Sequence, residues 1–174
     1  MAIKFFFDPE VASTKWVQQQ LSAISCGETL LDAGAGELRY KKYCQQLKYT
    51  SQDFAQYDVL GENIGLHTKN WDTSSVDIRS DITAIPVADH SFDNVLCTEV
   101  LEHVPLPELA IKEFARILKP GGRLIITAPF CSQAHFAPYH FCTGFNIYFY
   151  KTILESHKFQ IIEARANGNY FNYV

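Results

Sequence analysis

The sequence has no basic surplus. It carries 15 lysine and arginine residues against 19 aspartate and glutamate residues, which gives a formal net charge of -4 over 174 residues. Proteins that coat DNA or RNA neutralise phosphates with an excess of basic side chains. We therefore expect no DNA partner.

Long apolar runs are also missing. The longest candidates, residues 124–131 and 145–150, fall well short of the roughly 20 residues that a membrane helix needs. Residues 1–10 are aromatic and then acidic, unlike a secretory signal. The sequence therefore predicts no membrane partner.

Cysteines are few, odd in number and without a C-x-x-C pair. The five are Cys26, Cys44, Cys97, Cys131 and Cys142. A chain of this kind is typical of a reducing compartment, where thiols stay free. We therefore expect a cytoplasmic protein.

No repeat and no segment rich in Gly, Ser or Pro divides the chain. Its 174 residues, 47% of them hydrophobic and 20% charged, suit one globular domain. We predict a single domain over residues 1–174. Within it, 1–28 is an N-terminal helix region, 29–128 a cofactor-binding core, and 129–174 a substrate-side loop, helix and last strand.

Short apolar strands alternate with amphipathic helices along the chain. The spacing predicts helices over residues 11–24, 38–47, 107–118 and 145–157, and strands over 29–33, 47–53, 76–81, 92–98, 123–128 and 159–166. A long loop is expected over residues 57–75. Such alternation indicates an α/β protein whose parallel sheet is covered on both faces. Ligands of these sheets bind beyond the carboxyl ends of the strands.

A glycine turn and a second carboxylate mark two of those strand ends. Asp32, Gly34 and Gly36 follow the first strand, and Asp53 closes the second, 21 residues after Asp32. A carboxylate at this distance can accept the hydroxyls of a ribose. The pair predicts a cofactor that contains a nucleoside; the alternative is a tight structural turn.

The charges around the turn favour S-adenosylmethionine over a nicotinamide dinucleotide. Dinucleotide sites usually show G-x-G-x-x-G, but Arg39 stands at the third glycine position. The Asp32 carboxylate would repel a pyrophosphate. It suits the ammonium and sulfonium of S-adenosylmethionine, which has no phosphate. An NAD-dependent oxidoreductase remains an alternative.

Four segments resemble class I S-adenosylmethionine-dependent methyltransferases of the small-molecule branch, with a type 11-like domain. They are LLDAGAGE at 30–37, SDITAIP at 80–86, SFDNVLCTEVLEHV at 91–104 and LKPGGRL at 118–124. The resemblance implies a Rossmann-like, doubly wound, mostly parallel sheet with helices on both faces. Two features depart from the family pattern. Leu38 replaces a frequent third glycine, and the C-terminal hairpin is expected to be missing or shortened.

The resemblance also implies a cofactor site at the strand ends. Its residues would be Asp32, Gly34, Gly36, Asp53, Phe54, Asp81, Ile82, Cys97 and Thr98. The glycines would lie against the methionine portion and Asp32 near its amino group. Asp53 would hold the ribose hydroxyls. Phe54, Asp81 and the Ile82 backbone would meet the adenine, and the residues at 97–98 would pass beside the sulfonium.

Histidines near the strand ends are candidates for acceptor chemistry. His103 follows the fourth strand, and His140 lies in the loop 129–140, where the acceptor pocket of the family tends to form. We predict these two as catalytic residues, with Trp71, His135 and Tyr139 binding substrate. A base is needed only if the acceptor must lose a proton. The alternatives are that the histidines are structural and that Trp71 only anchors its loop.

Four possible zinc ligands, Cys131, His135, His140 and Cys142, also fall in this region. None of their pairs has a common ligand spacing, so we expect no metal. The sequence thus predicts methyl transfer from S-adenosylmethionine to a small-molecule acceptor by in-line displacement. The alternative is a non-catalytic cofactor-binding or regulatory domain of the same fold, and the oligomeric state is left open.

Overall fold

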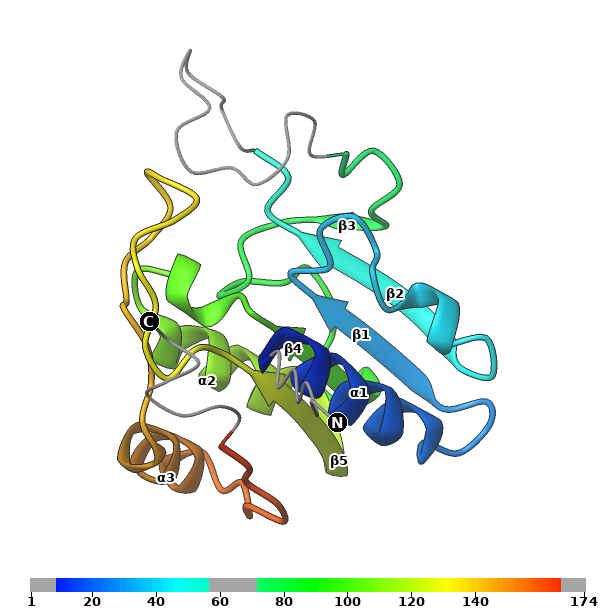
Figure 1. Cartoon of the computed structure of the whole chain (residues 1–174). Coiled ribbons are helices and arrows are strands. Elements are labelled where there is room, and N and C mark those ends of the chain that lie inside the picture. The colour runs from blue at the N-terminus through cyan, green and yellow to red at the C-terminus, as the bar shows by residue number, and fades with distance from the viewer. Residues whose placement is uncertain (1–8, 57–71, 167–174) are drawn as a thin grey trace, which may run out of the picture.

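The computed structural model describes residues 9–56 and 72–166 (Figure 1). Its helices are α1 (Pro9–Ser22), α2 (Pro107–Ile117) and α3 (Ile147–Ser156), with short 3-10 turns at Lys41–Tyr43 and Leu101–His103. Its strands are β1 (Thr29–Ala33), β2 (Lys48–Asp53), β3 (Ile78–Arg79), β4 (Phe92–Thr98) and β5 (Leu118–Thr127). Within these ranges, no helix is long and apolar enough to cross a membrane.

All five strands are parallel and form one sheet in the order β3-β2-β1-β4-β5. The chain builds outward from β1 through β2 to β3 and then returns to place β4 on the other side of β1. The strand order therefore reverses between β1 and β4, which is where open α/β sheets bind ligands. This arrangement confirms the predicted fold class.

Helices cover both faces of the sheet. On one face, Val17 and Leu21 of α1 pack against Leu30 and Leu96. On the other face, α2 and α3 pack against neighbouring strand positions such as Leu31. Adjacent residues of a strand point to opposite faces, so Leu30 and Leu31 serve the two clusters. Figure 1 shows α1 crossing in front of β4 and β5, with α2 on the far side.

The α2 helix follows directly from its sequence. Pro107 sits in the first turn, where its missing N–H costs no hydrogen bond. Ile111, Phe114 and Ile117 are fully buried on one side of the helix. The helix ends at Ile117, just before the Lys-Pro-Gly-Gly segment that cannot continue it.

Two predicted elements are shorter than the sequence indicated. The helix expected over residues 38–47 is only the 3-10 turn Lys41–Tyr43. Leu38 has a left-handed φ of 59°, which breaks a helical path, and β2 begins too soon afterwards for a longer helix. The strand expected over 76–81 pairs only at Ile78–Arg79. Just before it, Asp77 uses its carboxylate to bond the backbone N–H and hydroxyl of Ser51.

The last predicted strand, residues 159–166, is wrong. This segment has no regular secondary structure, and Ile162 within it is 85% exposed. A strand needs a neighbour for its backbone hydrogen bonds, and none of the described segments supplies one here. Instead, Glu163 accepts hydrogen bonds from Trp16 and Gln20, which tie this segment to α1.

Candidate functional site

The glycine turn after β1 is fixed against the end of β2. The backbone N–H groups of Gly34 and Ala35 both donate to the carbonyl of Gln52, at 2.8 and 2.9 Å. Gly34 has a φ of 75°, and a Cβ at this position would lie 2.4 Å from the side chain of Val100. Only glycine fits, because both the left-handed backbone and the close neighbour exclude a side chain.

Asp53 connects this turn to β2. Its carboxylate is 2% exposed; one oxygen accepts from the N–H of Gly36 at 2.8 Å and the other from the N–H of Ala55 at 2.9 Å. The structure therefore places the predicted glycines and the predicted ribose carboxylate side by side. A carboxylate oxygen can accept more than one hydrogen bond, so these contacts are compatible with a further hydroxyl.

Asp32 is a buried carboxyl group with one side-chain hydrogen-bond partner among the described residues. It is 2% exposed and accepts a hydrogen bond from the Tyr49 hydroxyl at 2.7 Å. Burial raises the pKa of Asp32 to about 7, an effect that the Tyr49 bond opposes and the Asp53 charge reinforces. Burial disfavours the charged form, so a cation placed beside Asp32 would stabilise its carboxylate strongly.

Tyr49 escaped the sequence reasoning. Only the register of β1 and β2 would have revealed it. Asp32 lies opposite Ser51, and Tyr49 is two residues before Ser51 on the same face of the sheet. Strand prediction alone gives the face but not the register. Burial, together with the charge of Asp32 and the hydrogen bond to it, raises the pKa of Tyr49 above its usual range, so its hydroxyl keeps its proton and donates a hydrogen bond.

The predicted adenine residues lie around β3. Asp81 is exposed, and one of its oxygens accepts from the N–H and hydroxyl of Thr83. Ile82 is buried in the core cluster. The N–H of Ser80 donates to the carbonyl of Asp53, which brings this segment to the end of β2. Phe54 follows directly.

The end of β4 is shaped by a backbone bend. Cys97 is fully buried in the core, where burial raises the pKa of its thiol well above the usual value. Its side chain therefore serves packing. Glu99 follows with a φ of 53°, and its N–H donates to the carbonyl of Thr127 at the end of β5. The bend leaves Thr98 half-buried at the strand end.

Three predicted histidines gather at this edge. His103 comes from the turn after β4, and His135 and His140 come from the loop after β5. The ring centroids lie 4.9 Å apart for His103 and His135, 4.8 Å for His135 and His140, and 5.9 Å for His103 and His140. Sequence distance hid this cluster, because the two loops meet only in the folded chain.

The imidazole of His103 is neutral at pH 7. Burial, with smaller contributions from the other two histidines, lowers the pKa of His103 to about 4, while its bond to the Tyr139 carbonyl acts in the opposite direction. Burial also lowers the pKa of His140, and His135 adds to this. Two rings of the cluster therefore present unprotonated nitrogen at neutral pH.

Tyr139 joins the cofactor side to the histidine side. Its carbonyl accepts from Nδ1 of His103 at 2.5 Å, and its ring centroid lies 6.3 Å from that of Phe54. The predicted substrate residues His135 and Tyr139 thus lie near the predicted catalytic pair. Trp71 lies outside the described residues.

Glu102 is a further buried acid that the sequence reasoning missed. It is 1% exposed, and burial raises its pKa to about 8, so the carboxyl is mainly protonated at pH 7. One oxygen lies 3.7 Å from Nε2 of His103; the other has no hydrogen-bond partner in the described parts of the chain. Its carbonyl accepts from Phe141 and Cys142, which holds the loop after β5 against this turn.

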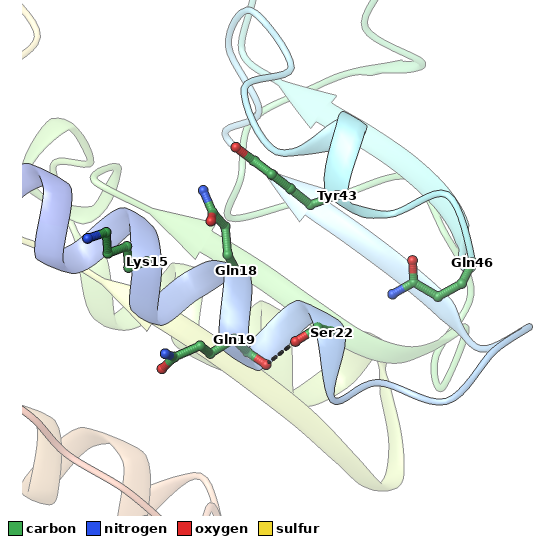
Figure 2. Close-up of a pocket in the computed structure, with 6 residues that line it drawn as sticks. All are labelled: Lys15, Gln18, Gln19, Ser22, Tyr43 and Gln46. Atoms are coloured by element: carbon green, nitrogen blue, oxygen red, sulfur yellow. Dashed lines mark hydrogen bonds between the residues drawn. The ribbon is translucent and has the colours of Figure 1, made fainter.

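An open surface hollow of about 600 Å³ lies elsewhere (Figure 2). It is lined by Lys15, Gln18, Gln19, Ser22, Tyr43 and Gln46, which come from α1 and the segment before β2. None of these residues belongs to the glycine turn or to the histidine cluster, so the hollow is separate from both.

The methyltransferase domain family matches residues 31–126, more than half of the 174-residue chain. The chain belongs to this family. The match contains the glycine turn, Asp53, the end of β4 and His103, which confirms the resemblance seen in the four sequence segments. It does not favour the NAD-dependent oxidoreductase, and it ends before the loop that carries His135 and His140.

Curated relatives of this methyltransferase-family chain match over partial lengths. A ubiquinone biosynthesis O-methyltransferase of Xanthomonas oryzae pv. oryzae is 51% identical over 47 residues, which are 27% of this chain and 20% of that protein. The Vibrio cholerae protein of the same name is 32% identical over 104 residues, 58% of this chain and 42% of its own length. The matched segments thus span less than half of these relatives.

A solved SAM-dependent methyltransferase from Archaeoglobus fulgidus shares the fold. It superposes with a TM-score of 0.65 over 87% of this chain and 69% of that chain, at 14% sequence identity. Identity this low carries the architecture and nothing about substrate.

Proposed function

We propose that the protein transfers a methyl group from S-adenosylmethionine to a small-molecule acceptor by in-line displacement. The observation that carries the proposal is the pair of buried carboxyl groups, Asp32 and Asp53, on either side of the glycine turn at the reversal of strand order. The family and the names of the relatives support the same reaction class.

The residues at the strand ends fit the donor. No cationic side chain of residues 9–56 and 72–166 pairs with the buried Asp32, and the ammonium of the methionine portion would supply a cation there. Gly34 and Gly36 would lie against that portion, where a side chain has no room at Gly34. Asp53 would accept the ribose hydroxyls. When bound, S-adenosylmethionine supplies an electrophilic methyl group on a sulfonium.

We assign the adenine and sulfonium contacts as the family pattern places them. Phe54 and Ile82 would meet the adenine ring, and Asp81 would accept from its amino group. The backbone at Cys97 and Thr98 would lie beside the sulfonium. The Cys97 side chain takes no part, because it is buried in the core.

The loop after β5 would form the acceptor side. His103 is neutral at pH 7 and keeps its Nδ1 on the Tyr139 carbonyl, so Nε2 can accept a proton from an acceptor hydroxyl. His140 would be the second proton acceptor. His135 and Tyr139 would contact the acceptor, as would Trp71. Aligning acceptor and methyl group while excluding water is the main work of such a site.

We infer further that residues 1–174 act as one domain, in the cytoplasm and without a DNA partner. The two core clusters share one sheet, which supports the single domain. All five cysteines are free, which supports a reducing compartment. The net charge of -4 supports the absence of a DNA partner.

The test combines binding and turnover. Calorimetry with S-adenosylhomocysteine should show one site per chain, and NAD should give no heat. Transfer of a labelled methyl group should then appear for members of a panel of phenols, quinols and amines. Binding without any labelled product would favour the non-catalytic alternative, and absence of binding by a folded protein would refute the proposal.

A further inference from the structure

The three clustered histidines present their ring nitrogens to one another. One nitrogen from each of His103, His135 and His140 lies within 4.8 Å of the other two. His103 comes from the turn after β4, and the other two side chains come from the loop after β5. Imidazole nitrogens that converge in this way are the usual ligands of zinc and related metals.

Backbone carbonyls determine which ring nitrogen of His103 and His135 is free to bind a metal. Nδ1 of His103 lies 2.5 Å from the carbonyl of Tyr139, and Nδ1 of His135 lies 2.9 Å from the carbonyl of Gln133. A carbonyl only accepts, so each Nδ1 carries the proton and each Nε2 presents a lone pair. Metal-bound histidines typically donate their other N–H to a carbonyl or carboxylate in this way.

His140 adds an independent observation. Both of its ring nitrogens are inaccessible to solvent, and neither has a hydrogen-bond partner among the described residues. Buried polar atoms nearly always have a hydrogen-bond partner, and one left unpaired destabilises the fold. A metal ion bound by one of the two His140 nitrogens would remove part of this destabilisation.

We propose that His103, His135 and His140 form a binding site for a divalent transition metal, with zinc as the best match to three imidazoles. Bonds of about 2.0 to 2.1 Å hold tetrahedral nitrogen ligands roughly 3.4 Å apart. The rings therefore close in by at most about 1.5 Å, which side-chain rotations in two loops can supply. The neutral imidazoles of His103 and His140 are in the form that binds metal.

The proposed ligand set differs from the four candidate ligands that lie close together in the sequence. Cys131 and Cys142 lie outside the converging group, and His103, more than thirty residues before His135, replaces them. Local spacing predicts no metal site, because nothing in the sequence brings His103 to this loop.

Three protein ligands leave a fourth position open. That position would lie on the acceptor side of the donor site, because Tyr139 bridges the cluster to Phe54. An oxygen of the acceptor could bind there, and the metal would then lower the pKa of that hydroxyl in place of the histidine bases, whose lone pairs would be bound to the metal. This last step rests on the proposed function, whereas the metal site itself does not.

The test uses the whole chain without an affinity tag, stripped with a chelator. Titration with Zn²⁺ in a calorimeter should give one site per chain, and Co²⁺ should give the visible absorption of a tetrahedral site. His135→Ala and His140→Ala should each weaken Zn²⁺ binding about tenfold or more, as loss of a direct ligand requires. The control His157→Ala, outside the cluster, should bind as the parent does.

Circular dichroism checks that each variant is folded. If a variant unfolds, X-ray absorption of the Zn²⁺-loaded parent decides instead: three imidazole ligands support the site, and fewer than three overturn it. No stoichiometric binding by the parent, or equal loss in His157→Ala, also overturns it. S-adenosylhomocysteine affinity is measured separately, so failure of donor binding is distinguishable from failure of metal binding.

Discussion

Single buried groups decide what the strand ends can bind. Within the described part of the chain, Asp32 pairs with no cation; its partner is the Tyr49 hydroxyl, and the charge of Asp53 further disfavours its ionised form. Without a bound ligand, this arrangement lowers the free energy of unfolding, as functional sites commonly do. Ligand binding should therefore depend on the protonation state of Asp32.

The affinity for S-adenosylhomocysteine should depend on pH through Asp32. The pKa of Asp32 is about 7 in the free protein, and only its ionised form attracts the ammonium of the ligand. Affinity should therefore rise between pH 5.5 and 7, by up to about tenfold per pH unit, and level off above. Calorimetry at several pH values measures this.

Asp32→Asn should weaken binding about tenfold or more and flatten that pH profile. The amide oxygen still accepts from Tyr49, so the fold is retained. Glu155→Gln, an exposed change on α3, should keep the parent profile. A steep profile that persists in Asp32→Asn would show that another group binds the ammonium.

Leu38 carries a second residue-scale prediction. Its φ of 59° lies in the left-handed region, which glycine adopts without strain. Leu38→Gly should be more stable than Leu38→Ala by about 0.5 to 1 kcal/mol, because both lose the same packing and only alanine keeps the strain. Urea denaturation measures the difference, and equal stabilities would contradict the backbone assignment.

At the scale of elements, side chains attach α2 to the chain before β4. The guanidinium of Arg116 donates to the carbonyls of Ile85 and Val87 and to the carboxylates of Asp89 and Glu113. Glu113 in turn accepts from the N–H of Ile85. This network replaces regular pairing where the segment between β3 and β4 has little secondary structure.

Arg116→Ala should destabilise the fold by about 2 to 4 kcal/mol, because it leaves the buried Glu113 carboxylate without its cation. Arg116→Ala combined with Glu113→Gln should recover part of that loss, because no buried charge then remains unpaired. Thermal and urea unfolding measure both. Equal loss in the single and double variants would show that packing, rather than charge, explains the effect.

At the scale of the whole molecule, buried acids shape stability against pH. Burial raises the pKa of Asp32 to about 7 and that of Glu102 to about 8. Groups raised in the folded state stabilise it at low pH, and this contribution is lost as pH rises through the folded pKa. His103 acts oppositely, since its pKa of about 4 makes stability rise between pH 4 and 6.5.

The opposing contribution of His103 ends near pH 6.5, so the two acids dominate above it. The free energy of unfolding should fall by about 2 kcal/mol between pH 6.5 and 8.5. Glu102→Gln should reduce that fall, and Glu155→Gln should leave it unchanged. Urea denaturation across the range measures it; a stability that rises with pH would contradict the assignment of Glu102.

Strand positions show what could be read from the sequence. The bounds of β1 and β4 match their predictions, because a short apolar run between turn residues fits a buried parallel strand. The glycine turn and Asp53 also meet as predicted, since parallel strands end at one edge. The strand predicted over 159–166 failed, because apolar spacing says nothing about a pairing partner.

The sequence by itself determined the family, the order of the strands and helices along the chain and the residue types at the strand ends. These depend on local patterns and on motif spacing along the chain. Only the tertiary structure decided that Tyr49 faces Asp32, that Glu102 is buried and that His103 meets His135 and His140. The physical reason is that register, burial and loop meeting points are set by packing between distant segments.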